Sequence, residues 1–316
     1  MRWLLILGLL PAWVGAQGAF PSRPMRIVVP APPGGGTDIL ARLVARKLTD
    51  TWGQPVIVDN RGGASGMIGS EIVARADPDG HTLLMSFTSH ATNPSLYSKM
   101  AYDTVRDFSG VAMAGVVPSI LVLHPSIPVT SVKDFIAYVK DRPGRLAYGS
   151  AGNGSAGHLS AVLFSSMTGT RMIHVPYKGS GPALPDLIAG QLQLMFGNMA
   201  SAIPHVKSGK IRALAVTSAR RSATAPELPT LAESGLSGYD ASAWFALFAP
   251  ARTPVAVVAK LNQEVNQMMR PAEMKERLLA IGADALALTP PELDKYVLAE
   301  IAKWGRVIRE SGAKPD

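Results

Sequence analysis

The sequence contains no cysteine among its 316 residues. This absence excludes disulfides, thiolate metal sites, a cysteine nucleophile and a lipid-anchored cysteine at a mature N-terminus. The protein must therefore gain its stability from a hydrophobic core. A chain of this length with 47% hydrophobic residues can bury such a core, and its size favours two α/β lobes.

Two further features are scarce. After residue 16, no stretch approaches the roughly twenty consecutive apolar residues that a membrane span needs. Aromatic residues make up only 6% of the chain and the lysines and arginines are scattered, which argues against a nucleic-acid partner. The formal net charge of +8 instead favours an anionic partner, because it attracts such a molecule over long range.

The common motifs of nucleotide binding and catalysis are also missing. The chain has no G-x-x-x-x-G-K-[ST], no G-x-S-x-G and no H-E-x-x-H, and its six histidines are dispersed. Ser155 and His158 are candidates for a nucleophile and a general base, but His158 is more simply a capping group. Lys178 is a candidate Schiff-base lysine or, more simply, a surface charge or an anion contact. We therefore predict no catalytic residue, cofactor or metal.

The first sixteen residues have the pattern of a secretory signal. Arg2 gives a short basic start, residues 4–10 are apolar, and Val14-Gly15-Ala16 is a small-residue cleavage pattern. We expect cleavage after Ala16 and a periplasmic mature protein. The alternative interpretation is a buried N-terminal helix.

Short β-rich runs alternate with amphipathic helices, which predicts parallel sheets wrapped by helices. The expected strands are residues 26–29, 56–58, 81–86, 146–148, 172–175, 192–196 and 211–217. The expected helices are residues 38–52, 66–76, 131–140, 182–189, 254–269, 271–281 and 290–310, with one more that begins at Ser155. Ser131 with Asp134, and Thr289 with Glu292, have the spacing of helix N-caps, and Gly53 is placed to end the first helix.

Two series of these elements begin alike, each with an Arg-initiated strand, a Gly-rich turn and a helix. They predict a first lobe of residues 22–122 plus 243–316 and a second lobe of residues 123–242. The chain would cross between the lobes near Leu123 and again at residues 239–244, which makes a hinge. The ligand cleft would lie between the lobes, where the loops after the strands face each other.

The Gly-rich loops are candidate anion sites, because a helix N-terminus has unpaired N–H groups and glycine lets the backbone approach a ligand closely. Gly34 to Gly36 with Thr37 form the first, with Thr37 or Asp38 as the helix cap. Residues 152–155 form the second, and residues 179–181 before Pro182 are the third. Tyr177 is placed either to contact a ligand or to pack between elements. Each loop could also be merely a tight connection.

Longer stretches resemble a known family. They are "PSRPMRIVVPAPPGGGTDILAR", "VIVDNRGGASGMIGSEIVARADPDGHTLLM", "NPSLYSKMAYDTVRDF", "YGSAGNGSAGHL", "HVPYKGSGPALPDLIAGQLQLMF" and "GKIRALAVTSARR". From Pro21 to the C-terminus the chain is similar to the extracytoplasmic solute receptors of tripartite tricarboxylate transporters, also called Bug or TctC-like proteins. Two departures stand out. Ala31 lies where many members have Phe, and residues 86–89 differ from a Gly-Thr-rich turn.

The resemblance implies a two-lobed type II periplasmic binding-protein fold of the α/β class that closes on a small carboxylate. It implies a di- or tricarboxylate, an acidic amino acid or an aromatic acid as the ligand, which is held largely by backbone amides. The implied ligand-binding residues are Ala31, Pro32, Gly34, Gly35, Thr37, Asp38, Ser86, Ser89, Ser150, Ala151, Gly152, Asn153, Gly154, Ser155, His158, Tyr177, Lys178, Gly179 and Asn198.

The function expected from these observations is capture of a carboxylate and its delivery to membrane transporter subunits, by a monomer without cofactor or metal. Two alternatives stay open at this point. One is a periplasmic hydrolase or transferase that uses Ser155 and His158. The other is a ligand sensor whose partner is a sensor kinase rather than a transporter.

Overall fold

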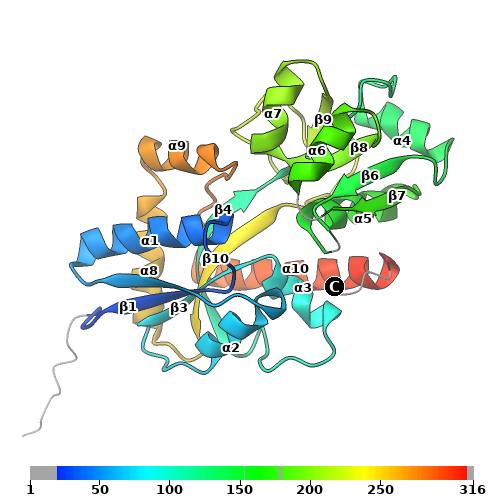
Figure 1. The fold of residues 1–316 in the computed structure, drawn as a ribbon. Helices are drawn as coiled ribbons and strands as arrows, with labels where there is room; N and C mark the ends of the chain where they lie inside the picture. The colour runs from blue at the N-terminus through cyan, green and yellow to red at the C-terminus, as the bar shows by residue number, and fades with distance from the viewer. Residues whose placement is uncertain (1–19, 153, 178–179, 312–316) are drawn as a thin grey trace, which may run out of the picture.

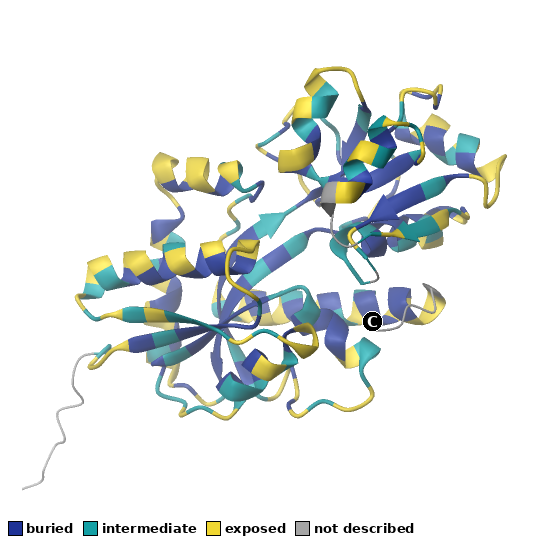
Figure 2. Cartoon of the chain, in the orientation of Figure 1, coloured by how far each residue is buried: buried dark blue, intermediate teal, exposed yellow. Residues whose placement is uncertain are grey.

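The computed structural model describes residues 20–152, 154–177 and 180–311, and these residues form two lobes, each built around a five-stranded sheet (Figure 1). The strands of both sheets are largely buried (Figure 2). The two-lobed α/β fold expected from the sequence is therefore confirmed. No helix in the described part of the chain is long and apolar enough to cross a membrane.

The first lobe contains the sheet β2-β1-β3-β10-β4. Its strands are β1 (Met25–Val29), β2 (Val56–Asn60), β3 (Thr82–Phe87), β4 (Phe108–Val117) and β10 (Ala243–Pro250). Its helices are α1 (Gly36–Trp52), α2 (Met67–Ala74), α3 (Ser89–Leu96), α8 (Val255–Met268), α9 (Ala272–Ala280) and α10 (Pro290–Ser311), and a short 3-10 turn, η1 (Ala64–Gly66), precedes α2.

The second lobe contains the sheet β7-β6-β8-β5-β9. Its strands are β5 (Ser119–Leu123), β6 (Ala147–Ser150), β7 (Ile173–Pro176), β8 (Leu194–Asn198) and β9 (Arg212–Val216). Its helices are α4 (Val132–Lys140), α5 (Ala156–Thr168), α6 (Ser180–Ile188) and α7 (Met199–Lys207).

Local signals placed several helix ends correctly. Helix α1 packs Leu40, Val44 and Leu48 into the core and ends at Gly53, whose φ of 67° is the left-handed conformation that glycine adopts easily. The Oγ of Ser131 accepts a hydrogen bond from the Asp134 N–H at 3.1 Å. These observations confirm the predicted end of α1 and the predicted start of α4.

The expectation of parallel sheets is only partly right. Strand β10 is antiparallel to both β3 and β4, and β5 is antiparallel to both β8 and β9. The sequence analysis did not predict β4, β5 or β10. Their pairing partners are distant in the sequence, so no local turn signal marks them, and both sheets are therefore mixed.

The chain crosses between the lobes at Pro118, because β4 ends at Val117 and β5 begins at Ser119. The crossing expected near Leu123 therefore differs from the observed topology, in which residues 119–123 pair with strands of the second sheet. The return crossing lies between Ala241, whose N–H still donates to Thr217 O in the second lobe, and the start of β10. We propose that Pro118 and Ser242 divide the lobes.

A buried carboxylate ties α10 to β10. Glu300 is 3% exposed, and its Oε2 accepts hydrogen bonds from Trp244 Nε1 at 3.0 Å and from Trp304 Nε1 at 2.8 Å. Lys303 forms an ion pair with its other oxygen. Helix α10 also contacts α5 of the second lobe, so this helix extends from one lobe to the other (Figure 1).

We predict that Glu300→Ala destabilises the fold, because both buried indole N–H groups lose their acceptor. Each unsatisfied donor costs about 1–3 kcal/mol, so the loss of the acceptor for two donors should lower the free energy of unfolding by roughly 2–6 kcal/mol in a urea titration. Glu300→Gln is the matched control, because an amide oxygen can accept both hydrogen bonds. Equal losses in the two variants would contradict this account of the tie.

Candidate functional site

A cavity of about 400 Å³ lies between the lobes beside the two crossings. The first lobe and the crossings supply Gly36, Ile39, Val117, Pro118, Ser119, Ala243, Phe245 and Ile281. The second lobe supplies Ser150, Ala151, Ser155, Ala156, Gly157, Met195, Phe196, Gly197 and Asn198. None of these described lining residues carries a charge, so any anion held here is bound by neutral groups.

Helix α1 presents its first turn to this cavity. Its N-cap is Gly35, which makes no side-chain capping bond, and the Ile39 N–H already donates to Gly35 O. The N–H groups of Gly36 and Thr37 have no hydrogen-bond acceptor among the described residues. An added Cβ on Gly36 would lie 3.3 Å from Phe245 Cζ, which shows how closely the backbone approaches the lining ring.

Asp38 organises this turn from inside the protein. Its Oδ2 accepts hydrogen bonds from the Gly34 N–H at 2.9 Å and from Arg42 Nε at 3.0 Å. Burial alone would raise the pKa of Asp38, but the hydrogen bonds from Arg42 and Gly34 outweigh it and lower that pKa. The carboxylate is therefore ionised and neutralised by Arg42, and neither Thr37 nor Asp38 is the helix cap that we expected.

Helix α5 presents its first turn from the opposite lobe. Ser155 is the N-cap, and its Oγ accepts the His158 N–H at 3.3 Å. The N–H groups of Ala156 and Gly157 have no acceptor among the described residues. An added Cβ on Gly157 would lie 2.5 Å from Phe196 O, so only glycine lets this turn pack against the end of β8.

A stack of three rings supports the loop before α5. His174 lies between Tyr148 and His158, with ring centroids 4.9 Å and 4.2 Å away. His174 Nε2 is 2.6 Å from Ser150 Oγ, and His158 Nδ1 accepts the Gly154 N–H at 3.1 Å. Because an acceptor nitrogen carries no proton, this geometry requires a neutral His158.

The other predicted residues lie in varied places. Ser150, Ala151, Ser155 and Asn198 line the cavity, and Asn198 also caps α7 through a bond from the Ser201 N–H at 3.2 Å. Those that do not line it are Ala31, Pro32, Gly34, Gly35, Thr37, Asp38, Gly152, Gly154, His158 and Tyr177. Asn153, Lys178 and Gly179 lie outside the described residues.

Three predicted residues, Tyr177, Ser86 and Ser89, have surroundings other than the cavity. The Tyr177 hydroxyl donates to Asp186 Oδ2 at 2.6 Å, and this bond together with burial raises the pKa of Tyr177 to about 12. Ser86 is 1% exposed within β3, and Ser89 is half-buried at the start of α3. None of the three lines the cavity.

The sequence analysis missed the apolar walls. Ile39, Phe245 and Ile281 come from three different elements of the first lobe and were not proposed as ligand contacts. For Phe245 there was a usable signal, since "AWFALFAP" is an apolar run of strand length between Ser242 and Ala251. Ile39 and Ile281 had no comparable signal, because their place depends on how α1 and α9 pack.

The arrangement does not support nucleophilic catalysis by Ser155. Its hydroxyl oxygen accepts the His158 N–H as a helix cap, whereas His158 Nδ1 accepts from Gly154. A triad requires a hydrogen bond between the nucleophile and the base nitrogen. Among the described residues, no group of three or more His, Asp or Glu side chains could hold a metal ion.

Acid should loosen the loop before α5. Burial lowers the pKa of His174 below its ordinary 6.5, so the folded protein favours the neutral ring. This stabilisation is complete above pH 6.5 and is lost as the pH falls through the lowered pKa. We expect the Gly154 amide to lose protection from hydrogen exchange between pH 7.5 and pH 5, after correction for intrinsic exchange.

His174→Phe keeps a ring in the stack and should remove most of this acid dependence. His205→Phe, on α7, should leave it as in the unmodified protein. If both variants respond to acid alike, His174 does not control the loop.

Comparison with known proteins shows the family. The family model of the tripartite tricarboxylate transporter family receptor matches residues 40–313. BugT of Bordetella pertussis is 39% identical over 320 residues, which cover 99% of this chain and 98% of BugT.

Two solved structures are informative. R. palustris Rpa4515 with adipate is 41% identical, covers 94% of this chain and 100% of its own, and gives a TM-score of 0.74. A TctC solute-binding protein from Polaromonas, solved with no ligand, is 27% identical, covers 92% of this chain and 99% of its own, and gives a TM-score of 0.83. These relatives are substrate-binding receptors and not enzymes. The chain belongs to the tripartite tricarboxylate transporter family receptors, the solute receptors that bind carboxylates for transport.

Proposed function

We propose that this receptor captures a dicarboxylate with an apolar middle, of which adipate is the model compound, and delivers it to membrane transporter subunits. The single observation that carries the proposal is the pair of unpaired helix first turns, one from each lobe, at an uncharged cavity with apolar walls. Two separated sets of N–H donors suit two carboxylates, and the walls between them suit methylene groups.

The backbone N–H donors of the two helix ends are sufficient for micromolar binding of a dicarboxylate. Hydrogen bonds to a charged group contribute about 1.5–3 kcal/mol each, and a helix dipole adds about 0.3–1 kcal/mol. Micromolar binding corresponds to about −8 kcal/mol. Two such bonds at each carboxylate, with burial of the apolar middle against Phe245 and Ile39, reach that value after the cost of ordering the ligand.

The arrangement of the lobes supports binding by closure. This structure superimposes better on the unliganded Polaromonas protein (TM-score 0.83) than on the adipate complex (TM-score 0.74). The sequence of the adipate-bound protein is nevertheless the more similar one, so the difference reflects how the lobes are arranged. We infer that the lobes are in an open arrangement here. A ligand that contacts both helix ends gains the second set of contacts only when the lobes approach, so it shifts the population toward the closed form.

The remaining predicted residues fit this proposal in supporting roles. Gly34, Asp38, Ser150, Gly152, Gly154 and His158 would shape the two loops, while Ala31, Pro32, Gly35, Thr37, Ser155 and Asn198 would lie at or beside the ligand. We propose a monomeric receptor. Pull-down from membranes with and without adipate would identify the partner of the receptor. Recovery of a sensor kinase instead of transporter subunits would show that the receptor serves signalling and not transport.

We predict that Ala156→Pro weakens adipate binding by about 10- to 100-fold, because it removes one charge-assisted hydrogen bond. Proline is well tolerated at the first position of a helix, and Ser155 has the extended backbone (φ −65°, ψ 157°) that a following proline requires. Isothermal titration calorimetry measures the change.

Gly36→Pro tests the other lobe in the same way, and Gly36→Ala is its matched control because it adds a Cβ but keeps the N–H. Malate, a shorter and more polar dicarboxylate, should bind more weakly than adipate. If both proline variants bind adipate as tightly as the unmodified protein, the ligand does not use these amides.

We also propose that the protein is exported and cleaved after Ala16. Mass spectrometry of the protein recovered from the periplasm should then give Gln17 as its first residue. A different first residue would show that the predicted cleavage site is wrong. Recovery of the intact chain from the cytoplasm would contradict export.

A further inference from the structure

A second cavity, of about 550 Å³, lies between the lobes on the other side of the crossing strands. Val117 and Ala243 line the first cavity, whereas the residues just before them, Val116 and Ser242, line the second. Because successive side chains of an extended chain point to opposite faces, the two crossings separate the two cavities. The second cavity is therefore on the back of the hinge.

Both lobes contribute walls to this back cavity. The first lobe contributes Leu279 of α9, Leu286 of the segment after α9, and Tyr296 of α10. Arg220 comes from the loop after β9 in the second lobe, and Lys275 of α9 faces the cavity from the first. Cavities between domains that combine an apolar lining with a few polar groups are the usual binding sites for small molecules.

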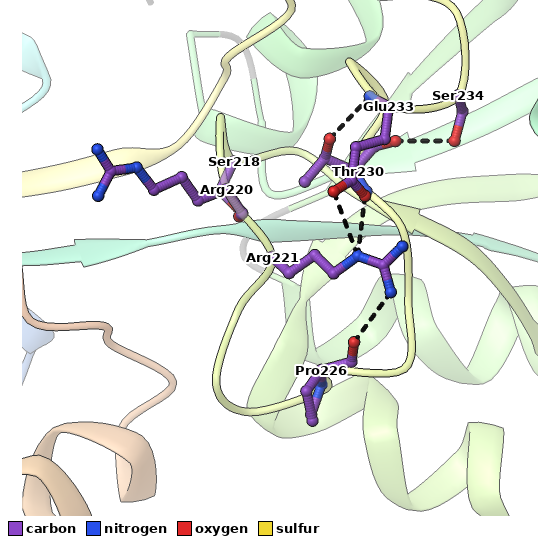
Figure 3. Close-up of polar contacts among 7 residues, drawn as sticks. All are labelled: Ser218, Arg220, Arg221, Pro226, Thr230, Glu233 and Ser234. Carbon is purple, nitrogen blue, oxygen red and sulfur yellow. Dashed lines mark hydrogen bonds and ion pairs between the residues drawn. The ribbon is translucent and has the colours of Figure 1, made fainter.

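The cationic groups of this cavity are available to a ligand. Among the described residues, neither the Arg220 guanidinium nor the Lys275 ammonium makes a hydrogen bond or an ion pair. Arg221 differs, since its side chain donates to Glu233 Oε2 at 2.9 Å and to Pro226 O at 3.3 Å. Figure 3 shows the Arg220 side chain extending away from Arg221 and its partners.

The acidic groups that line the cavity are already engaged by the chain. Asp240 Oδ1 accepts from Ser242 N at 3.3 Å and from Ser242 Oγ at 3.1 Å, and Asp284 Oδ1 accepts from Ala223 N at 3.2 Å. The Tyr296 hydroxyl has no partner among the described residues, and burial raises its pKa, so it stays a neutral donor. Each carboxylate accepts these bonds through Oδ1, and neither forms an ion pair with Arg220 or Lys275 in the described part of the chain, so both cations stay free to pair with an anion.

We propose that the back cavity is a second binding site for an amphipathic anion, an aromatic or branched hydrocarbon that carries one carboxylate or sulfonate. The anionic group pairs with Arg220 and Lys275, and the hydrocarbon packs on Leu279 and Leu286. The volume of the back cavity, about 550 Å³, lies within the range of about 300–1,000 Å³ that small-molecule sites have.

Occupancy of this site opposes closure of the ligand cleft. The cavity and the cleft lie on opposite faces of the same hinge, so bringing the lobes together over the cleft moves the walls of the back cavity apart. An occupant that contacts both lobes in the open arrangement loses contacts on closure. By thermodynamic reciprocity it then lowers the affinity of the cleft for its own ligand.

The direct test is calorimetric titration of the full chain with 2-naphthalenesulfonate. We expect binding that weakens at least tenfold in an Arg220→Ala/Lys275→Ala double variant. Both side chains are exposed and without partners, so the fold should be unaffected, which the thermal midpoint checks. Lys133→Ala on α4, exposed and distant from the cavity, is the control for charge and should not change the affinity.

Ala156→Pro, which we expect to weaken adipate binding in the cleft, should retain full affinity for 2-naphthalenesulfonate. Loss of binding in that variant, or equal affinity in the double variant, would mean that the probe binds elsewhere and would overturn the proposal. So would the absence of binding at millimolar concentration. These outcomes do not depend on whether adipate binds, so failure of the carboxylate proposal is recognised separately.

Coupling is tested by titrating adipate with and without saturating 2-naphthalenesulfonate. We expect the adipate affinity to fall at least threefold in the unmodified protein and to stay constant in the double variant. An unchanged affinity in the unmodified protein would show that the site does not act on the hinge.

Discussion

The unpaired N–H groups at the first turns of α1 and α5 are the interaction on which the cleft depends. Both helices begin directly after a Gly-rich loop at the carboxyl end of a strand, so their positive ends are directed at the space between the lobes. No charged side chain among the described residues lines that space. In the function that we propose, the site attracts carboxylates through its backbone geometry, and its apolar walls select the hydrocarbon between them.

That geometry is maintained by side chains that do not line the cavity. Asp38 orders the loop before α1 by accepting from Gly34 and Arg42, and the stacked rings of His158 and His174 support the loop before α5. Both supports place a titratable group just behind the helix first turns that border the cavity. Strong acid would therefore affect these loops before it affects the hydrophobic core.

The hinge connects the two lobes through very few residues. Pro118 alone separates β4 from β5, and Ser242 precedes β10. Because the ligand cleft and the back cavity use opposite faces of these crossings, a movement that narrows one widens the other. Helix α10, tied to β10 through Glu300, extends along the first lobe and contacts α5 of the second.

The sequence by itself determined the features that depend on near neighbours in the chain. The Ser131 cap, the start of α5 at Ser155 and the end of α1 at Gly53 were predictable, because capping and helical periodicity act over a few residues. Only the tertiary structure decided that β10 inserts between β3 and β4, because those partners are more than a hundred residues away. It also decided that Asp38 turns inward to Arg42 and that Phe245, Ile39 and Ile281 meet at the cleft, because these positions follow from packing between elements, which no local pattern encodes.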